Sequence, residues 1–150
     1  EIGDKQAFMD MLVERTVGIL TREPIDIYVN PTFLPDVIAA EYDTLWTEER
    51  MDRVIQAAVK NGVAIEINAN SLTVRPGSDE NCKDVVALCL RHHVPMFINS
   101  DAHSMYSVGE FRGAVELVAS MGVPESAILN TSFAKAMEFI EQRKAIRRRG

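Results

Sequence analysis

The chain has 150 residues, 47% hydrophobic and 25% charged, the composition of a globular protein long enough to bury its own core. Its formal net charge of −6 argues against a general nucleic-acid binder, and no apolar run approaches the roughly 20 residues that span a membrane. No signal peptide is visible, so we expect a cytoplasmic protein in which Cys82 and Cys89 are buried free thiols.

Hydrophobic periodicity predicts short apolar strands that alternate with amphipathic helices. Thr47 and Ser78 mark two helix starts as N-caps, and Gly62 and Gly122 mark two helix ends. In chain order, the sequence predicts a helix over 4–20, a strand over 25–29, a short helical turn near 36–41, a helix over 47–61, a strand over 63–67, a polar loop, a helix over 78–90, a strand over 94–98, a helix over 107–121, a strand over 127–129 and a last helix from 132.

This alternation is typical of an α/β fold in which helices cover a parallel sheet. Four such units make either a small open sheet or half of a (β/α) barrel, and the length favours the open sheet because a whole barrel needs about 250 residues. We expect residues 1–150 to form a single α/β domain. Its basic tail over 143–150 either stabilises the carboxyl end of the last helix or contacts nucleic acid or an acidic partner.

Polar residues follow each predicted strand, and in both architectures ligands gather at the carboxyl ends of strands. The four strand ends are residues 30–32, 66–70, 99–103 and 130–132. Asn, Ser and Asp are also common in ordinary turns, so each strand end alone is a weak indication. Their coincidence at one edge of a sheet favours a functional site there.

Asp101 and His103 are the strongest candidates for metal ligands. They lie two residues apart where a strand ends, and an extended chain directs such residues to the same side. A carboxylate and a neutral imidazole that converge on one point suit a divalent cation such as zinc or manganese. The alternative is a histidine that only hydrogen-bonds within a loop.

Glu66 and Arg75 each have a structural and a functional interpretation. Glu66 lies in an apolar strand, where a buried carboxylate needs a partner. It is either held by structural ion pairs or hydrogen bonds, or it supports metal ligands or acts as a general base. Arg75 precedes a predicted helix start, where a guanidinium and free backbone N–H groups suit a phosphate; the alternative is an ordinary surface arginine.

Three segments resemble, in order and spacing, the later motifs of the PHP (polymerase and histidinol phosphatase) family. They are Asp-Ile-Tyr-Val-Asn-Pro at 26–31, Glu-Ile-Asn at 66–68 and Asn-Ser-Asp-Ala-His at 99–103, and the last is followed by Val108-Gly109. The resemblance covers about residues 25–140. It implies a distorted (β/α)₇ barrel and a metal-dependent phosphoesterase or related hydrolase that binds zinc, manganese or iron.

On this resemblance, Asp101 and His103 are metal ligands, and Asn30 is a weak ligand or a water-positioning group. Asn30 stands where the family pattern has the histidine of a His-Pro pair, and an amide oxygen is a poor substitute for imidazole toward zinc. Glu66 and Asn68 would support the site. Arg75 would contact the phosphate of a phosphorylated small molecule or other phosphoester.

A second departure from the family concerns the start of the chain. The opening Asp-x-His-x-His motif and further ligands belong to earlier strands, but residues 1–24 contain no histidine and look like one helix. The sequence therefore resembles the carboxyl-terminal half of such a barrel, and we expect weak or absent metal binding and little activity from this chain alone. We expect the missing barrel half or a second copy of the chain as its partner, because a half barrel exposes edge strands.

Three hypotheses follow from the sequence. The chain is part of a metal-dependent phosphoesterase, or a PHP-derived domain that has lost catalysis and serves in binding or assembly. The third hypothesis is an unrelated open α/β domain in which Asp101 and His103 form an ordinary turn.

Overall fold

The computed structural model describes residues 2–74 and 78–148, and it has the mixed α/β architecture that the alternating pattern predicts. Three parallel strands form one sheet in the order β1-β2-β3. The strands are β1 (Ile27–Tyr28), β2 (Ala64–Asn68) and β3 (Met96–Asn99). A parallel sheet with a helical crossover between successive strands is consistent with part of a (β/α) barrel.

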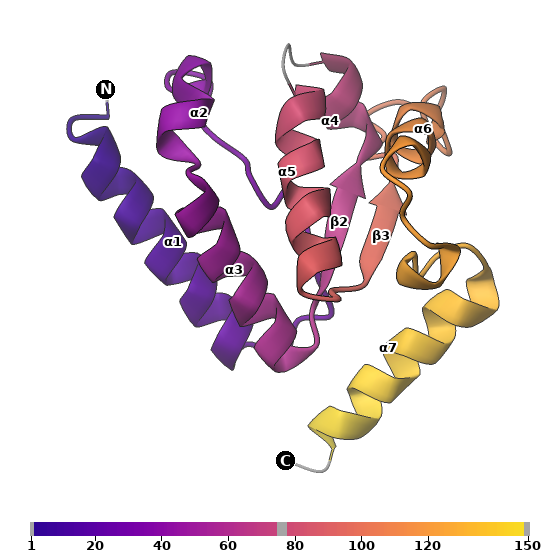
Figure 1. Ribbon diagram of the computed structural model, residues 1–150. Helices are drawn as coiled ribbons and strands as arrows, with labels where there is room; N and C mark the ends of the chain where they lie inside the picture. The colour runs from indigo at the N-terminus through magenta and orange to yellow at the C-terminus, as the bar shows by residue number, and fades with distance from the viewer. Residues whose placement is uncertain (1, 75–77, 149–150) are drawn as a thin grey trace.

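Helices occupy most of the remaining chain, and Figure 1 shows α5 in front of the sheet while α1 lies beside α3. None of the described helices has both the length and the hydropathy to span a bilayer. The helices are α1 (Lys5–Arg22), η1 (Ala39–Glu41), α2 (Tyr42–Leu45), α3 (Glu48–Asn61), α4 (Ala69–Val74), α5 (Ser78–Arg91), α6 (Arg112–Ser120), η2 (Glu125–Ala127) and α7 (Phe133–Arg147).

Side-chain caps fix three helix starts where the sequence predicts them. Asp4 accepts a hydrogen bond from the Ala7 backbone N–H at 3.0 Å, and Thr47 and Ser132 accept equivalent bonds at the starts of α3 and α7. Gly62 ends α3 with a φ of 63°, a left-handed conformation that glycine adopts without steric cost. These local signals explain why the helix boundaries are close to the predicted ones.

The register of the sheet brings polar side chains to one face. Ile65 and Ile67 of β2 are fully buried in the core, and strand alternation directs Glu66 and Asn68 to the opposite face. Glu66 is paired with Phe97 and Asn68 with Asn99, so the polar ends of β2 and β3 lie side by side. The hydrophobic side of the strands therefore holds the sheet in place, and the other side presents polar groups at the carboxyl edge.

The predicted strand over 127–129 is wrong. Residues 125–127 form the 3-10 helix η2, and this segment contributes an isolated parallel bridge between Ile128 and Met96. The Asn130 side chain accepts a hydrogen bond from the Ile98 N–H and donates one to the Ile98 carbonyl, at 3.0 and 2.6 Å. Because the Asn130 side chain bonds to both backbone groups of Ile98, the backbone hydrogen bonds between β3 and the segment around Ile128 do not continue past the single bridge.

The helical turn expected near 36–41 is confirmed by η1, and it continues into α2. Two further segments differ from the prediction. The expected polar loop after β2 contains α4. The helix expected from 107 begins at Arg112. A hydrogen-bonded turn between Ser104 and Ser107, followed by Gly109 at a φ of 80°, keeps the preceding segment out of the helix. Neither cysteine forms a disulfide; Cys89 is buried as predicted, whereas Cys82 is half-buried.

Helix α7 is held to the rest of the fold by polar contacts, and none of its residues is fully buried. Figure 1 shows α7 running from the β3 side of the sheet back toward the ends of α1 and α3. There the largely buried Arg143 guanidinium donates to the backbone carbonyls of Asn61 and Ile25, and Arg147 forms an ion pair with Asp26. These cations of the basic tail therefore serve in tertiary packing.

We expect Arg143→Ala to lower the free energy of unfolding by about 1.5 kcal/mol, because hydrogen bonds from charged donors contribute about that much or more. Amide hydrogen exchange in the second half of α7 should accelerate in the same variant. Lys144→Ala is the matched control, since Lys144 forms an exposed ion pair with Glu141 and should change stability by less than about 0.5 kcal/mol. Equal effects of the two substitutions would contradict the proposed anchoring of α7.

Candidate functional site

Five residues at the carboxyl edge of the sheet form a closed ring of hydrogen bonds through their side chains and two backbone N–H groups; it is here called the strand-end ring. Asn68 Nδ2 donates to Asn30 Oδ1 at 2.9 Å and to Asp101 Oδ2 at 3.0 Å. Glu66 accepts from the Asn30 backbone N–H at 2.7 Å and from Asn99 Nδ2 at 2.6 Å, and Asn99 Oδ1 accepts from the Asp101 N–H at 3.3 Å. The ring therefore ties together the ends of all three strands.

Glu66 is the buried carboxylate of this ring, with 3% of its surface exposed. Its two described hydrogen bonds come from a backbone N–H and a side-chain amide, both of them neutral donors. Hydrogen bonds satisfy the lone pairs of a buried carboxylate but leave its negative charge in place. Glu66 is therefore held in place by hydrogen bonds, and its carboxylate makes the strand-end ring electronegative.

Asn30 and Asp101 have left-handed backbone conformations, with φ angles of 48° and 46°. Asn and Asp are among the non-glycine residues that tolerate this region. In both cases the left-handed residue follows the end of a strand closely and turns the chain, so that a side-chain oxygen meets Asn68. The two oxygens that accept from Asn68 lie within 3.0 Å of the same nitrogen, and each is therefore within twice that distance of the other.

His103 lies outside the strand-end ring but is attached to it. Its Nδ1 lies 2.7 Å from the backbone carbonyl oxygen of Asp101, and its ring is exposed. A carbonyl oxygen only accepts, so Nδ1 is the protonated nitrogen in this contact, and Nε2 keeps its lone pair in the neutral ring. Fixing the tautomer through one nitrogen is a common arrangement for histidines whose other nitrogen binds a metal.

Few side chains of the kinds that bind metals lie close together in the described part of the chain. Within residues 2–74 and 78–148, no group of three or more His, Cys, Asp or Glu side chains lies close enough together to hold a metal ion. A catalytic zinc normally takes three protein ligands. Asp101 and His103, the strongest predicted ligands, would supply two, and the amide oxygen of the predicted weak ligand Asn30 already accepts from Asn68.

The structure brings together four of the six predicted site residues, Asn30, Glu66, Asn68 and Asp101, and places His103 beside them. The sixth, Arg75, lies outside the described residues. Asn99 was not predicted as a site residue, although it bonds to both Glu66 and Asp101. The available signal was an Asn at a strand end two residues before Asp101, since an Asn side chain often bonds the backbone two residues further on.

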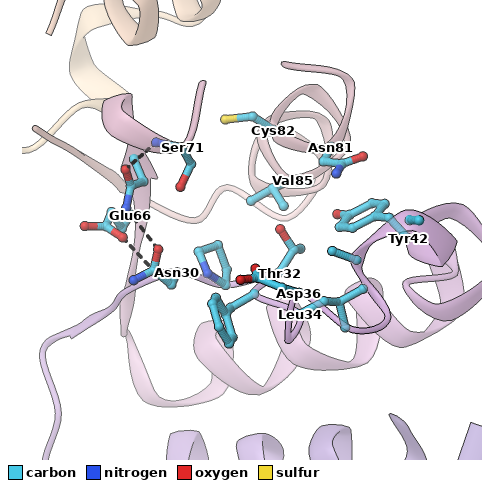
Figure 2. Close-up of a pocket in the computed structure, with 15 residues that line it drawn as sticks. Asn30, Thr32, Leu34, Asp36, Tyr42, Glu66, Ser71, Asn81, Cys82 and Val85 are labelled. Carbon is cyan, nitrogen blue, oxygen red and sulfur yellow. Dashed lines mark hydrogen bonds between the residues drawn. The ribbon is translucent and has the colours of Figure 1, made fainter. Parts of the chain in front are cut away.

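A cavity of about 410 Å³ adjoins the strand-end ring. Figure 2 shows Asn30 and Glu66 at one end of it and Tyr42 at the other, with Cys82 and Val85 of α5 along one side. The described lining contains the carboxylates of Asp36 and Glu66 and no Lys, Arg or His. Burial raises the pKa of Tyr42 above its usual value, although a hydrogen bond with Thr32 acts in the opposite direction. The Tyr42 hydroxyl is therefore neutral at physiological pH.

The chain is similar in sequence to several proteins named as probable phosphatases. One from Acetivibrio thermocellus is 32% identical over 139 residues, which cover 92% of this chain and 56% of the relative. One from Clostridium botulinum is 36% identical over 90 residues, and the probable phosphatase YcdX of Escherichia fergusonii is 38% identical over 91 residues. Each of these two matches covers 60% of this chain and 37% of the relative.

No protein-family model matches the chain. Its matched region spans between about a third and just over half of the length of these three relatives. The chain is therefore similar to part of the length of several proteins named as probable phosphatases.

Proposed function

We propose that this chain is part of a metal-dependent phosphoesterase of the PHP type, in which it contributes one portion of the active site. Asp101 and His103 would bind a divalent cation such as zinc, manganese or iron, and Asn30 would be a weak ligand or would position a water molecule. Glu66 and Asn68 would hold these groups in place, and Arg75 would contact the phosphate of the substrate.

The observation that carries this proposal is the strand-end ring. The three segments that resemble PHP motifs are far apart in the sequence, and the ring joins a residue from each of them through hydrogen bonds. Any parallel sheet brings its strand ends to one edge, and here the residues that meet and bond at that edge are those of the three segments that resemble PHP motifs. The relatives named as probable phosphatases support the same class of reaction.

Local charge supports a role for a cation at this edge. Glu66 and Asp101 belong to the ring and Asp36 lines the adjoining cavity, whereas the ring and the described cavity lining contain no Lys or Arg. An anionic phosphate placed among these carboxylates is repelled unless positive charge is supplied. A divalent cation at Asp101 and His103, and Arg75, would supply that charge.

A second candidate function is a catalytically degenerate PHP-derived domain that serves binding or assembly. Two observations favour it. Asn30 occupies the place of a family histidine, and the described residues lack three clustered metal ligands. Under this hypothesis the strand-end ring would stabilise the sheet edge without catalysis.

The test is hydrolysis of phenyl phosphate with added manganese, measured for this chain and for the complete product of its gene. We expect near-background turnover from the chain alone, because two strong ligands do not hold a catalytic metal. A gene product that carries an upstream Asp-x-His-x-His segment should show turnover that His103→Ala abolishes. Absence of turnover from such a product would favour the degenerate domain, and rapid turnover by the chain alone would contradict the expected incompleteness of its site.

A further inference from the structure

The cavity beside the strand-end ring has mostly apolar walls, whereas the ring itself consists of polar residues. Its volume of about 410 Å³ lies in the range of small-molecule sites in proteins, roughly 300–1,000 Å³. One wall comes from α5, and the opposite wall from the segment between β1 and α2. Asn30 and Glu66 lie at the end that faces the ring (Figure 2), and Asn68 also lines the cavity. The cavity is therefore a compartment that opens onto the candidate site.

The walls of this compartment are mostly apolar. Leu34 and Val85 are almost completely buried and are supported by the hydrophobic core, so their positions are fixed. Pro31, Phe33 and Ala40 add further apolar surface. An organic group that enters displaces water from these walls and gains about 25 cal/mol per Å² of apolar surface buried.

The polar groups of the compartment are mainly neutral. Tyr42 and Thr32 present hydroxyls, and Asn81 presents an amide. The half-buried Tyr42 stays protonated at physiological pH. Its hydroxyl donates to Met51 Sδ at 3.8 Å, and its oxygen can accept from a ligand hydroxyl. Asp36 and Glu66 are the carboxylates of the described lining and disfavour an anion.

We propose that the cavity binds the alcohol part of a phosphomonoester, an uncharged organic group with an apolar body and at least one hydroxyl, while the phosphate lies outside it near Asp101 and His103. Asn68 connects the two places, since it lines the cavity and its amide donates to Asp101. The identification of this alcohol as part of a phosphoester rests on the proposed function. The binding of a neutral alcohol in the cavity is independent of the proposed function.

Cys82 allows a direct measurement of occupancy. It lines the cavity and is half-buried, whereas Cys89 is fully buried and burial raises its pKa to about 12. Thiolates are the reactive form, so a maleimide near neutral pH should label Cys82 much faster than Cys89. Benzyl alcohol is the probe, used in metal-free buffer. At four times its dissociation constant it should slow the labelling of Cys82 about fivefold.

Two variants show whether this protection arises in the cavity. Ala40 is exposed and lines the cavity, so Ala40→Phe should fill the mouth without disturbing the core and should abolish protection by benzyl alcohol. Ala119→Phe is the matched control, because Ala119 is exposed on α6 and does not line the cavity. It should keep the full protection. Inorganic phosphate should protect neither variant nor the original chain.

Absence of protection by benzyl alcohol in the original chain overturns the proposal, and so does undiminished protection in Ala40→Phe. Protection by inorganic phosphate equal to that by benzyl alcohol overturns it as well, since it would assign the cavity to the phosphate. These measurements need neither metal nor turnover. A failed protection assay together with manganese-dependent hydrolysis by the complete gene product rejects the alcohol site alone. Protection without hydrolysis rejects the phosphoesterase alone.

Discussion

Replacing Glu66 by alanine is expected to lower the free energy of unfolding by about 2–3 kcal/mol, because it removes charge-assisted hydrogen bonds and leaves a donor without its acceptor. Glu66 is 3% exposed and accepts from the Asn30 backbone N–H and from Asn99 Nδ2. Alanine offers no oxygen to either donor. The change can be measured by urea unfolding, as a shift in midpoint at an unchanged denaturant slope.

Glu66→Gln is the matched control for this prediction. Its amide oxygen can still accept from the Asn30 N–H, and Asn99 is exposed, so its freed amide can bond to water. We expect this variant to lose less than about half of the stability that Glu66→Ala loses. An unchanged midpoint in Glu66→Ala, or equal losses in both variants, would show that the strand-end ring does not stabilise the sheet edge.

Asn30→His is expected to tighten manganese or zinc binding at least tenfold, because outer partners of metal ligands already change affinity by roughly 10–100-fold and this substitution adds a ligand. The φ of 48° at Asn30 suits the change, since histidine is also enriched in the left-handed region and His93 of this chain adopts a φ of 56°. The introduced imidazole would stand beside Asp101, which shares the Asn68 amide with Asn30. Isothermal titration with each metal measures the effect.

The double variant Asn30→His, His103→Ala tests whether the added ligand acts in the same site. If the introduced imidazole and His103 bind one ion, removing His103 should cancel most of the gain, and the two substitutions should be strongly non-additive. A gain in affinity that persists in full without His103 would place the new metal elsewhere. If Asn30→His does not raise the metal affinity at all, position 30 is too far from the metal bound by Asp101 and His103 to supply a ligand.

Local chemistry determines which parts of this fold are predictable from sequence. The caps at Asp4, Thr47 and Ser132 act within one helical turn, so those helix starts can be located from the sequence. The end of the expected fourth strand depends on Asn130 binding the backbone of Ile98, a contact between residues 32 positions apart. The sequence pattern around 127–129 does not reveal that the Asn130 side chain takes the place of a backbone partner for Ile98.

The same distinction applies to the candidate site. The carboxyl-edge rule predicts from the sequence alone that Asn30, Glu66, Asn68 and Asp101 lie together. The hydrogen bonds between them depend on the sheet register and on two left-handed residues, which the sequence pattern does not specify. Helix α4 was missed for a related reason: Asn68 Oδ1 accepts from the Ser71 N–H at 3.0 Å at its start, and the segment looks like a polar loop in the sequence.

Metal titration of this chain and of its Asp101→Ala and His103→Ala variants tests the central proposal most directly. Asp101 and His103 are the two proposed strong ligands, beside a ring of neutral amides and carboxylates, so we expect the chain to bind manganese or zinc weakly and at one site. Each substitution should abolish that binding, while Asn130→Ala, at another strand end, should not. Only trace metal in the original chain, unchanged by either substitution, would contradict a metal role for Asp101 and His103.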